Sequence, residues 1–405
     1  MKFASILALP LAVLSLQASD WPRFLGPNGN GQVPAGLSLN TDWQSAPPAT
    51  LWTADLGSGC SSFAIAEGKA ITLGNANNVD TIRCFDAATG EVIWSHSYDE
   101  PKEAKYYPGG TTATPTIDGD RVYVVSKQGK LFCFEFETGE ILWERDYKSD
   151  FDGRRQGWGW ACSPLVYGDL LIIDPGAKDG SIVALNKRTQ EVVWKIGSNE
   201  PGYAMPVVYQ ADGRDHLAVF HRKALAAYSL EPPEGPLFTY SWRTNYGVNA
   251  SNPHYRDGKM FIGSGYGSGY GVIDVSDNQP ELLHRDRGLE LKFQTSLLVD
   301  DRIIAHFGDE KKGNDLVAMD FESGNLHWRH EMPGKFGNAI AIGETIIVFT
   351  DSGHVVAGKD RGDRFEEQAN RKFLDGLCWA PPSYADGKLY LRSLQGDAIC
   401  LDLTE

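Results

Sequence analysis

The sequence predicts an all-β fold: an eight-bladed β-propeller of four-stranded antiparallel blades, with the ring closed by an N-terminal strand. Two observations predict it. A turn followed by a Trp recurs about every 50 residues, and eight short segments rich in small polar residues each precede a run of β-branched and aromatic residues. Repeats of this length, filled with short strands, are typical of propeller blades.

The recurring turn is clearest at residues 86–94. An alternating run ends at Phe85, and a second β-rich run leads to Trp94. Between them, the side chains of Asp86 and Thr89 can bond nearby backbone N–H groups, and Gly90 can adopt a positive φ. The pattern predicts a hairpin whose second strand carries a Trp. Further copies end at Trp143, Trp194 and Trp328, with a degenerate copy at Trp242.

The eight polar segments, here called lead-in segments, give the number of blades. They span residues 60–63, 113–115, 161–164, 204–206, 250–253, 294–297, 337–340 and 379–382. The last blade ends near Asp402 without a Trp strand, whereas residues 51–56, around Trp52, have no partner strands of their own. We expect this N-terminal strand to complete the last blade, because ring closure removes exposed sheet edges.

The N-terminal region divides into three parts. Residues 1–18 combine Lys2 with a short apolar run and small residues near Ala18, which predicts a signal peptide and export to the periplasm or beyond the cell. No Cys lies near the cleavage site, so we expect no lipid anchor, and the apolar run is short for a transmembrane segment. Residues 19–47 form a Trp-, Pro- and Gly-rich arm expected to lie against the ring, and residues 48–405 form the propeller.

The charge limits the partners. Lys and Arg number 38 against 53 Asp and Glu, for a net charge of −15, and such an acidic surface argues against nucleic acid or anionic membrane as a partner. We expect a monomer that binds an unknown protein, small molecule or glycan.

The T/S-G-E-x-x-W repeats, the eight blades, the secretory signal and the opening residues Trp21 to Pro27 resemble the PQQ-like β-propeller repeat superfamily, the quinoprotein dehydrogenase-like proteins. The resemblance implies one of two branches. One comprises enzymes that hold pyrroloquinoline quinone (PQQ) and calcium in the central funnel. The other comprises non-catalytic propellers resembling BamB, a scaffold of the outer-membrane protein assembly machine.

The sequence departs from both branches. It lacks the adjacent cysteines that the enzymes commonly place over the quinone, and no matching Glu, Asn and Asp set for calcium is found. It also lacks the anchor Cys that is usual in the scaffold branch. We favour the non-catalytic branch and expect no cofactor, no metal and no catalytic residue. The alternatives are a PQQ-dependent alcohol or sugar dehydrogenase with calcium, and a carbohydrate-binding propeller.

The cysteines fall into two sets. Cys84, Cys133 and Cys400 occupy the third-strand position where other blades have Ala, which predicts small buried core residues. Cys60 and Cys378 precede blades one and eight, which are neighbours in a closed ring. A disulfide between these two is one alternative in an oxidising compartment, and free thiols are the other.

The candidate binding site lies where the lead-in segments converge on the ring axis. Residues 154–160 combine positive charge with flat aromatic surface, which suits carboxylates and planar or extended groups. The candidate residues are Arg154, Arg155, Trp158, Trp160, Tyr203, Asn249, Gln294, Asn338 and Trp379. The alternative is that these side chains only fill a wide ring. The binding hypothesis predicts that Trp160→Ala or Arg155→Ala abolishes binding with little loss of stability.

Overall fold

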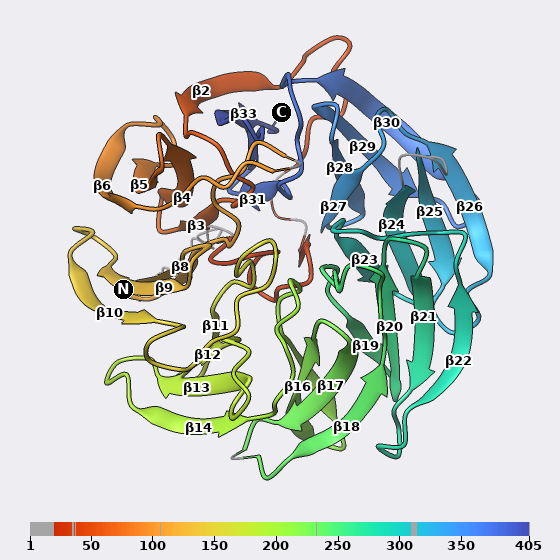
Figure 1. Cartoon of the computed structure of the whole chain (residues 1–405). Helices are drawn as coiled ribbons and strands as arrows, with labels where there is room; N and C mark the ends of the chain where they lie inside the picture. The colour runs from red at the N-terminus through yellow and green to blue at the C-terminus, as the bar shows by residue number, and fades with distance from the viewer. Residues whose placement is uncertain are drawn as a thin grey trace, which may run out of the picture.

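The computed structural model describes residues 20–404, except residues 35, 37, 106, 232 and 309–313. The predicted signal peptide lies outside the described residues. Eight blades surround one axis (Figure 1), and the described part of the chain contains strands and turns but no helix. None of it therefore forms a helix long and apolar enough to cross a bilayer. The predicted fold class is confirmed.

Each blade places its strands from the axis outward in antiparallel order. The first four blades comprise β3 (Ala64–Ala66), β4 (Lys69–Ala76), β5 (Val79–Asp86) and β6 (Val92–Asp99); β7 (Thr116–Asp118), β8 (Arg121–Val125), β9 (Lys130–Glu135) and β10 (Ile141–Asp146); β11 (Leu165–Tyr167), β12 (Leu170–Ile173), β13 (Ile182–Asn186) and β14 (Val192–Ile196); and β15 (Val207–Ala211), β16 (Arg214–Phe220), β17 (Ala224–Ser229) and β18 (Pro236–Ser241).

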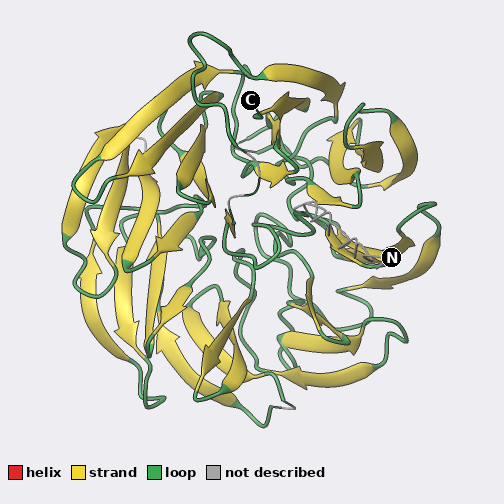
Figure 2. Ribbon diagram, turned by 180° about the vertical axis from the view of Figure 1, so that it is seen from behind, coloured by secondary structure: helices red, strands yellow, loops and turns green. Residues whose placement is uncertain are grey.

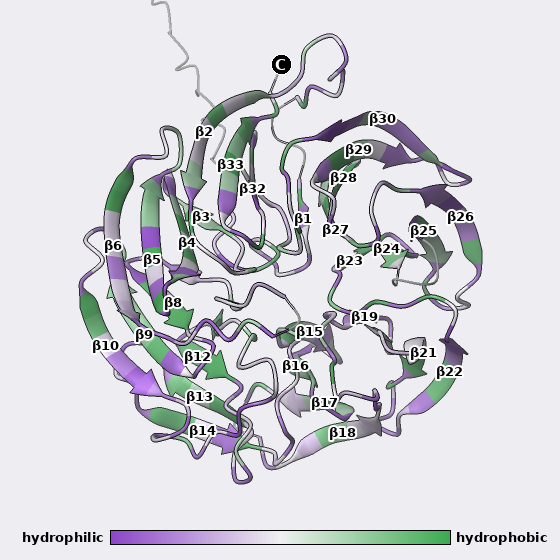
Figure 3. Cartoon of the chain, turned by 45° about the horizontal axis from the view of Figure 1, so that its top comes forward, coloured by the Kyte–Doolittle hydropathy of each residue, from purple (hydrophilic) through white to green (hydrophobic). Residues whose placement is uncertain are grey.

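The remaining blades continue the pattern around the ring. They comprise β19 (His254–Arg256), β20 (Lys259–Ser264), β21 (Gly269–Asp274) and β22 (Glu281–Asp286); β23 (Ser296–Val299), β24 (Arg302–Gly308), β25 (Asn314–Asp320) and β26 (Leu326–Glu331); β27 (Gly337–Ile342), β28 (Thr345–Thr350), β29 (His354–Asp360) and β30 (Phe365–Lys372); and β31 (Ser383–Ala385), β32 (Lys388–Arg392) and β33 (Asp397–Asp402). Hydrophobic residues concentrate in the inner strands, whereas outer strands such as β26 and β30 are mostly hydrophilic (Figure 3).

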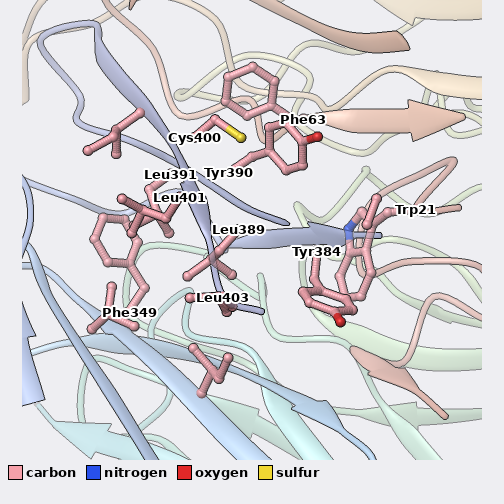
Figure 4. Packing of buried hydrophobic residues seen from close by; sticks show 14 of the residues in the cluster. Trp21, Phe63, Phe349, Tyr384, Leu389, Tyr390, Leu391, Cys400, Leu401 and Leu403 are labelled. Atoms are coloured by element: carbon pink, nitrogen blue, oxygen red, sulfur yellow. The ribbon is translucent and has the colours of Figure 1, made fainter. Parts of the chain in front are cut away.

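The N-terminal strand closes the ring as predicted. Strand β2 (Ala49–Asp55) pairs antiparallel with β33, which sets Trp52 opposite Cys400. Trp52 is buried and stacks with Phe85 of the first blade, with ring centroids 5.7 Å apart. Figure 4 shows the aromatic and leucine side chains of the last blade gathered in this core. Closure therefore joins both ends of the chain through one apolar cluster.

The repeated turn holds neighbouring blades together. Asp86 accepts backbone N–H bonds from Ala88 and Thr89, as expected for this turn. The Trp94 indole N–H donates to the Phe136 carbonyl of the next blade at 2.9 Å, and the Trp94 ring covers Gly139 in that blade's own turn. The Gly and the Trp of the repeat thus belong to one contact between successive blades.

The strand register identifies the position of this Trp in every blade. It lies opposite a small third-strand residue, next to a β-bulge: Trp94 faces Cys84 and Trp143 faces Cys133. The predicted core role of Cys84, Cys133 and Cys400 is confirmed, since all three are buried. The assignment of Trp242 as a repeat copy is wrong, because Phe238 occupies the position and Trp242 follows the strand. The full set is Trp94, Trp143, Trp194, Phe238, His284, Trp328, Ala369 and Trp52.

The arm runs across one end of the ring from Trp21, bonded to blade one, to Val33, paired with blade seven, and we call this end the arm face. Figure 2 shows the ring from behind. Trp21 exchanges two backbone hydrogen bonds with Ile65 of blade one, and the Pro22 carbonyl accepts from Ile117 N of blade two. Phe24 packs on the cluster between blades three and four. Strand β1 (Gln32–Val33) then pairs in parallel with β27 of blade seven. These contacts reach blades on different sides of the ring, so the arm crosses this end of it.

Candidate functional site

The other end of the ring carries the lead-in segments and the loops between second and third strands, and we call it the funnel face. The first strand of a blade runs from the funnel face to the arm face, because the arm pairs with β27 at Ala341 and Ile342, the end of that strand. Loops from different blades therefore converge on the funnel face around the axis (Figure 1). The candidate site lies on this face.

Aromatic side chains form a continuous chain across the funnel face, which we call the aromatic arc. Successive ring centroids along one half are 5.7 Å apart for Trp158 and Tyr107, 6.2 Å for Tyr107 and Trp379, and 4.8 Å for Trp379 and Phe293. The arc continues from Phe293 to Phe336 at 5.3 Å. These rings come from loops of five blades, so the arc depends on the assembled ring.

The other half of the arc is bridged by a cation. Lys292 Nζ lies 5.4 Å from the ring centroids of both Phe336 and Tyr266. Tyr266 in turn meets Tyr246 edge-on at 5.0 Å, and Tyr246 is 69% exposed. An ammonium over aromatic faces is favourable, because the ring quadrupole attracts positive charge. The arc therefore ends in an open aromatic surface next to a fixed positive charge.

Trp379 sits at the middle of the arc, with Tyr107 on one side and Phe293 on the other. Its indole N–H is buried and has no hydrogen-bond partner among the described residues. Buried donors are normally satisfied, so a carbonyl from a bound partner or a water would complete this group. The Trp379 ring itself is half-buried.

A charged triad supports Tyr107. Lys127 Nζ donates to the Tyr107 hydroxyl at 2.8 Å and lies 3.5 Å from a carboxylate oxygen of Glu103, which also pairs with Arg155. Burial lowers the pKa of Lys127 and raises the pKa of Tyr107. Partial burial opposes ionisation of Glu103, but the hydrogen bond from Gln128 and the charges of Arg155 and Lys127 hold its pKa below the usual value. The Glu103 carboxylate thus pairs with both Lys127 and Arg155.

Of the predicted site residues, Arg155, Trp158, Tyr203 and Trp379 are brought to the funnel face with partial exposure. Trp158 N–H donates to the Tyr203 hydroxyl at 3.3 Å, which adds Tyr203 to the edge of the arc. Burial raises the pKa of Tyr203, so this hydroxyl stays protonated.

Trp160 is not brought to the funnel surface. Its ring is 2% exposed, packs edge-on against Tyr147 at 5.5 Å and donates to the Pro175 carbonyl at 3.3 Å. An extended chain would send residues 158 and 160 to one side. Gly159 prevents this, because its φ of 90° turns the backbone between them. Trp160 is therefore a core residue of the blade, and the prediction that its loss leaves stability almost unchanged has to be replaced.

Arg154 also forms its hydrogen bonds within the fold. Its guanidinium donates to the carbonyls of Gly176 at 2.5 Å and Ser198 at 2.7 Å. These bonds tie the loop before blade three to the loop before its third strand and to the segment after its fourth. Arg154 thereby shapes the rim of the funnel without presenting a free charge.

The predicted amide residues are buried and bonded to backbone. Asn249 donates to the His221 carbonyl at 2.8 Å and accepts from the Ser264 hydroxyl. Gln294 accepts two backbone N–H bonds from residues 292 and 293, which orders the loop that carries Lys292. Asn338 joins Thr295 N–H to the Trp379 carbonyl across blades. These amides position the site and offer few free groups to a ligand.

Sequence analysis did not single out several members of the site, namely Tyr107, Glu103, Lys127, Tyr246, Tyr266, Phe293 and Phe336. Phe293 and Phe336 immediately precede lead-in positions, so that spacing could have found them. Tyr107 lies in the long loop between blades one and two, where no repeat marks its place.

The cysteines are free thiols. Cys60 and Cys378 are not joined, and Cys60 Sγ instead faces the Thr111 carbonyl at 3.6 Å. Burial raises the pKa of the Cys60 thiol, although the charges of Arg392 and Lys127 oppose this. A thiol with a raised pKa is a poor nucleophile, so Cys60 offers little reactivity to the site.

The residues at the funnel do not fit PQQ with calcium. A planar quinone needs an open aromatic face, whereas Tyr107 and Phe293 flank Trp379 on both sides. In the ranges that the structure describes, no group of three or more His, Cys, Asp or Glu residues is arranged to hold a metal. The amides that could have served as oxygen ligands bond to backbone instead. We derive no quinone chemistry from this arrangement.

Eight antiparallel blades with this interlocking Trp turn place the chain in the class of PQQ-repeat β-propellers. The sequence profile of the family described as outer membrane protein assembly factor BamB matches residues 78–281, half of the chain. The chain belongs to this family. No curated protein sequence matches it.

Solved structures of BamB and of alcohol dehydrogenases share the fold. BamB from Moraxella catarrhalis superposes with a TM-score of 0.61 at 15% identity, covering 88% of this chain and 99% of that one. A quinohemoprotein alcohol dehydrogenase from Pseudomonas putida gives 0.66 at 12% identity, covering 95% and 80%. A europium-containing methanol dehydrogenase gives 0.67 at 9%, covering 93% and 90%. At such identities these likenesses concern the fold alone.

Proposed function

We propose that this chain is a non-catalytic binding scaffold, exported to the cell envelope, that holds a partner protein on its funnel face. The aromatic arc carries the proposal. Interfaces that bind tightly tend to concentrate Trp, Tyr and Arg at their centres. The arc offers this composition on one face, with Trp158 and Arg155 toward one end and Tyr246 at the other.

The chemistry of the funnel supports binding over catalysis. Its buried amides are bonded to backbone, its thiol has a raised pKa, and its carboxylate Glu103 is engaged by two cations. A catalytic site would need a nucleophile and a base with free capacity. The family description supports an envelope role, since it names an assembly factor of the outer membrane.

A photo-crosslinking residue at position 246 tests the proposal in cells that express the full chain. Because Tyr246 is 69% exposed at the end of the arc, a partner on the funnel face should be captured there. The same residue at position 142, exposed on the outer strand β10, is the matched control. Capture from position 142 but not 246 would contradict the proposal. So would dye-linked oxidation of an alcohol or sugar on addition of PQQ and calcium, which would support a dehydrogenase.

A further inference from the structure

The loops around the arc carry both carboxylates and cations: Asp351 accepts the Lys335 backbone N–H, Glu290 accepts the Gly267 backbone N–H, and Glu103 pairs with Arg155 and Lys127. The protein carries −15, yet the loops around the arc supply several cations. Neither Lys292 nor Lys335 has an ion-pair partner among the described carboxylates. Lys335 is exposed, and Lys292 is half-buried between aromatic rings.

On the opposite side of the funnel face, two further cations are incompletely neutralised. Arg155 and Lys127 share the single carboxylate of Glu103. The side chain of Lys127 is only 2% exposed, so its charge is poorly screened by water. An incoming carboxylate near Arg155 would meet a net positive charge. The rings of Tyr107, Trp379, Phe293 and Phe336 therefore lie between Arg155 and Lys292, whereas Tyr266 and Tyr246 lie beyond Lys292.

The packing of the aromatic rings limits the kind of anionic ligand that the arc can bind. Sugars bind by lying flat on an open aromatic face. Tyr246, at the end of the arc, offers such a face, but Trp379 at its middle is flanked by Tyr107 and Phe293. The middle of the arc carries apolar ring surface and one indole N–H, that of Trp379, without a hydrogen-bond partner among the described residues. Apolar side chains pack on such rings, and an N–H suits a peptide carbonyl. The arm crosses the other end of the ring, so a bound chain would lie across the funnel face.

We propose that the funnel face binds an extended acidic peptide segment of the partner, with carboxylates at Lys292 and Arg155 and apolar side chains on the arc between them. This inference rests on the proposed function and names the chemistry of its partner. Complementary charge also steers association and makes it depend on salt.

A short synthetic peptide of alternating Glu and Phe, labelled for fluorescence anisotropy, serves as the probe for the folded chain. We expect it to bind at least about tenfold more tightly than the Gln–Phe peptide, with a preference that falls as salt rises. Partly exposed ion pairs contribute modestly, so Lys292→Gln and Arg155→Gln should each raise Kd about 2- to 5-fold. Lys195→Gln, the same charge change on the outer strand β14, should leave Kd unchanged.

Equal affinity for the two peptides, no measurable binding of the Glu–Phe peptide, or an unaffected Lys292→Gln variant would each overturn the inference. Displacement of the peptide by neutral oligosaccharides with higher affinity would also overturn it, in favour of a glycan. The proposed function fails separately: a Trp158→Ala variant that carries the crosslinker at position 246 and still captures its cellular partner normally would remove the funnel face as the binding surface. Loss of that capture without any preference for acidic peptides would leave the scaffold and reject the acidic segment.

Discussion

The contact between Trp94 and Gly139 gives a sharp test of how the blades interlock. Gly139 has a φ of 72°, and a Cβ atom added there would lie 2.5 Å from the Trp94 ring of the preceding blade. The ring cannot easily move away, because its N–H bonds to Phe136 and it stacks on Phe134. Gly139→Ala should therefore strain both the backbone and the junction between the blades.

A matched control separates the two contributions to the loss of unfolding free energy, backbone strain and overpacking. Gly119, in the same blade, has a φ of 54° but nothing within 4 Å of an added Cβ. Gly119→Ala should lower the free energy of unfolding by about 1–2 kcal/mol, the usual cost of a left-handed non-glycine residue. Overpacking adds about 1–3 kcal/mol, so Gly139→Ala should cost about 2–5 kcal/mol in total.

Urea unfolding followed by far-UV circular dichroism would measure both variants, provided that the m-value stays unchanged. A double-mutant cycle with Trp94→Ala isolates the contact, because removing the ring leaves the added methyl group without an obstacle. In the Trp94→Ala background, Gly139→Ala should cost only as much as Gly119→Ala. Equal costs for the two glycine variants in the wild-type background would refute the interlocking of Gly and Trp.

Three further predictions follow from the core, the closure and a buried carboxyl. Trp160→Ala should cost about 3–5 kcal/mol in unfolding free energy, seen as a lower urea midpoint, because it removes a ring that is 2% exposed; an unchanged midpoint would contradict its placement in the core. A chain starting at residue 50 should retain a cooperative unfolding transition, whereas one starting at residue 57 should aggregate in light scattering, because the edge of β33 is then unpaired; equal behaviour would argue against the closure. Burial raises the pKa of Asp80 from 3.8 to about 6, so the folded state holds this proton more tightly and the contribution of Asp80 to stability should fall as pH rises across that interval. The stability of the wild type relative to Asp80→Asn should therefore decline over that interval in pH-dependent melting, and a difference that stays constant or rises would be evidence against the buried, protonated carboxyl.

The repeat predicts much of the fold because its residues have a local physical role. Asp86, Thr89 and Gly90 build the turn, and Trp94 fills the junction, so their pattern marks a blade wherever it is intact. The pattern loses this power where another side chain fills the junction. In blade four Phe238 does so, and Trp242, at nearly the right spacing, has a different role: its indole N–H bonds to Ser264.

The site was less predictable, because sequence shows which residues approach the axis and not which groups they bond. Asn249, Gln294 and Asn338 were predicted to serve a ligand, yet buried backbone groups need partners, and these amides supply them. Tyr107 reaches the arc only because Lys127 and its neighbours hold the loop in place. Neither outcome follows from a period or a motif.

Trp158 and Trp160 show that side-chain alternation alone does not predict which aromatic ring reaches the funnel face. Both are aromatic, both precede the same blade, and alternation would give them the same surroundings. The positive φ of Gly159 separates them, so one ring joins the funnel face and the other joins the core. A Cβ at Gly159 would lie 2.7 Å from the Lys127 carbonyl, which means that the same close approach bringing this loop onto Lys127 also requires the glycine. The glycine, rather than either Trp, therefore decides which aromatic ring is available to a partner.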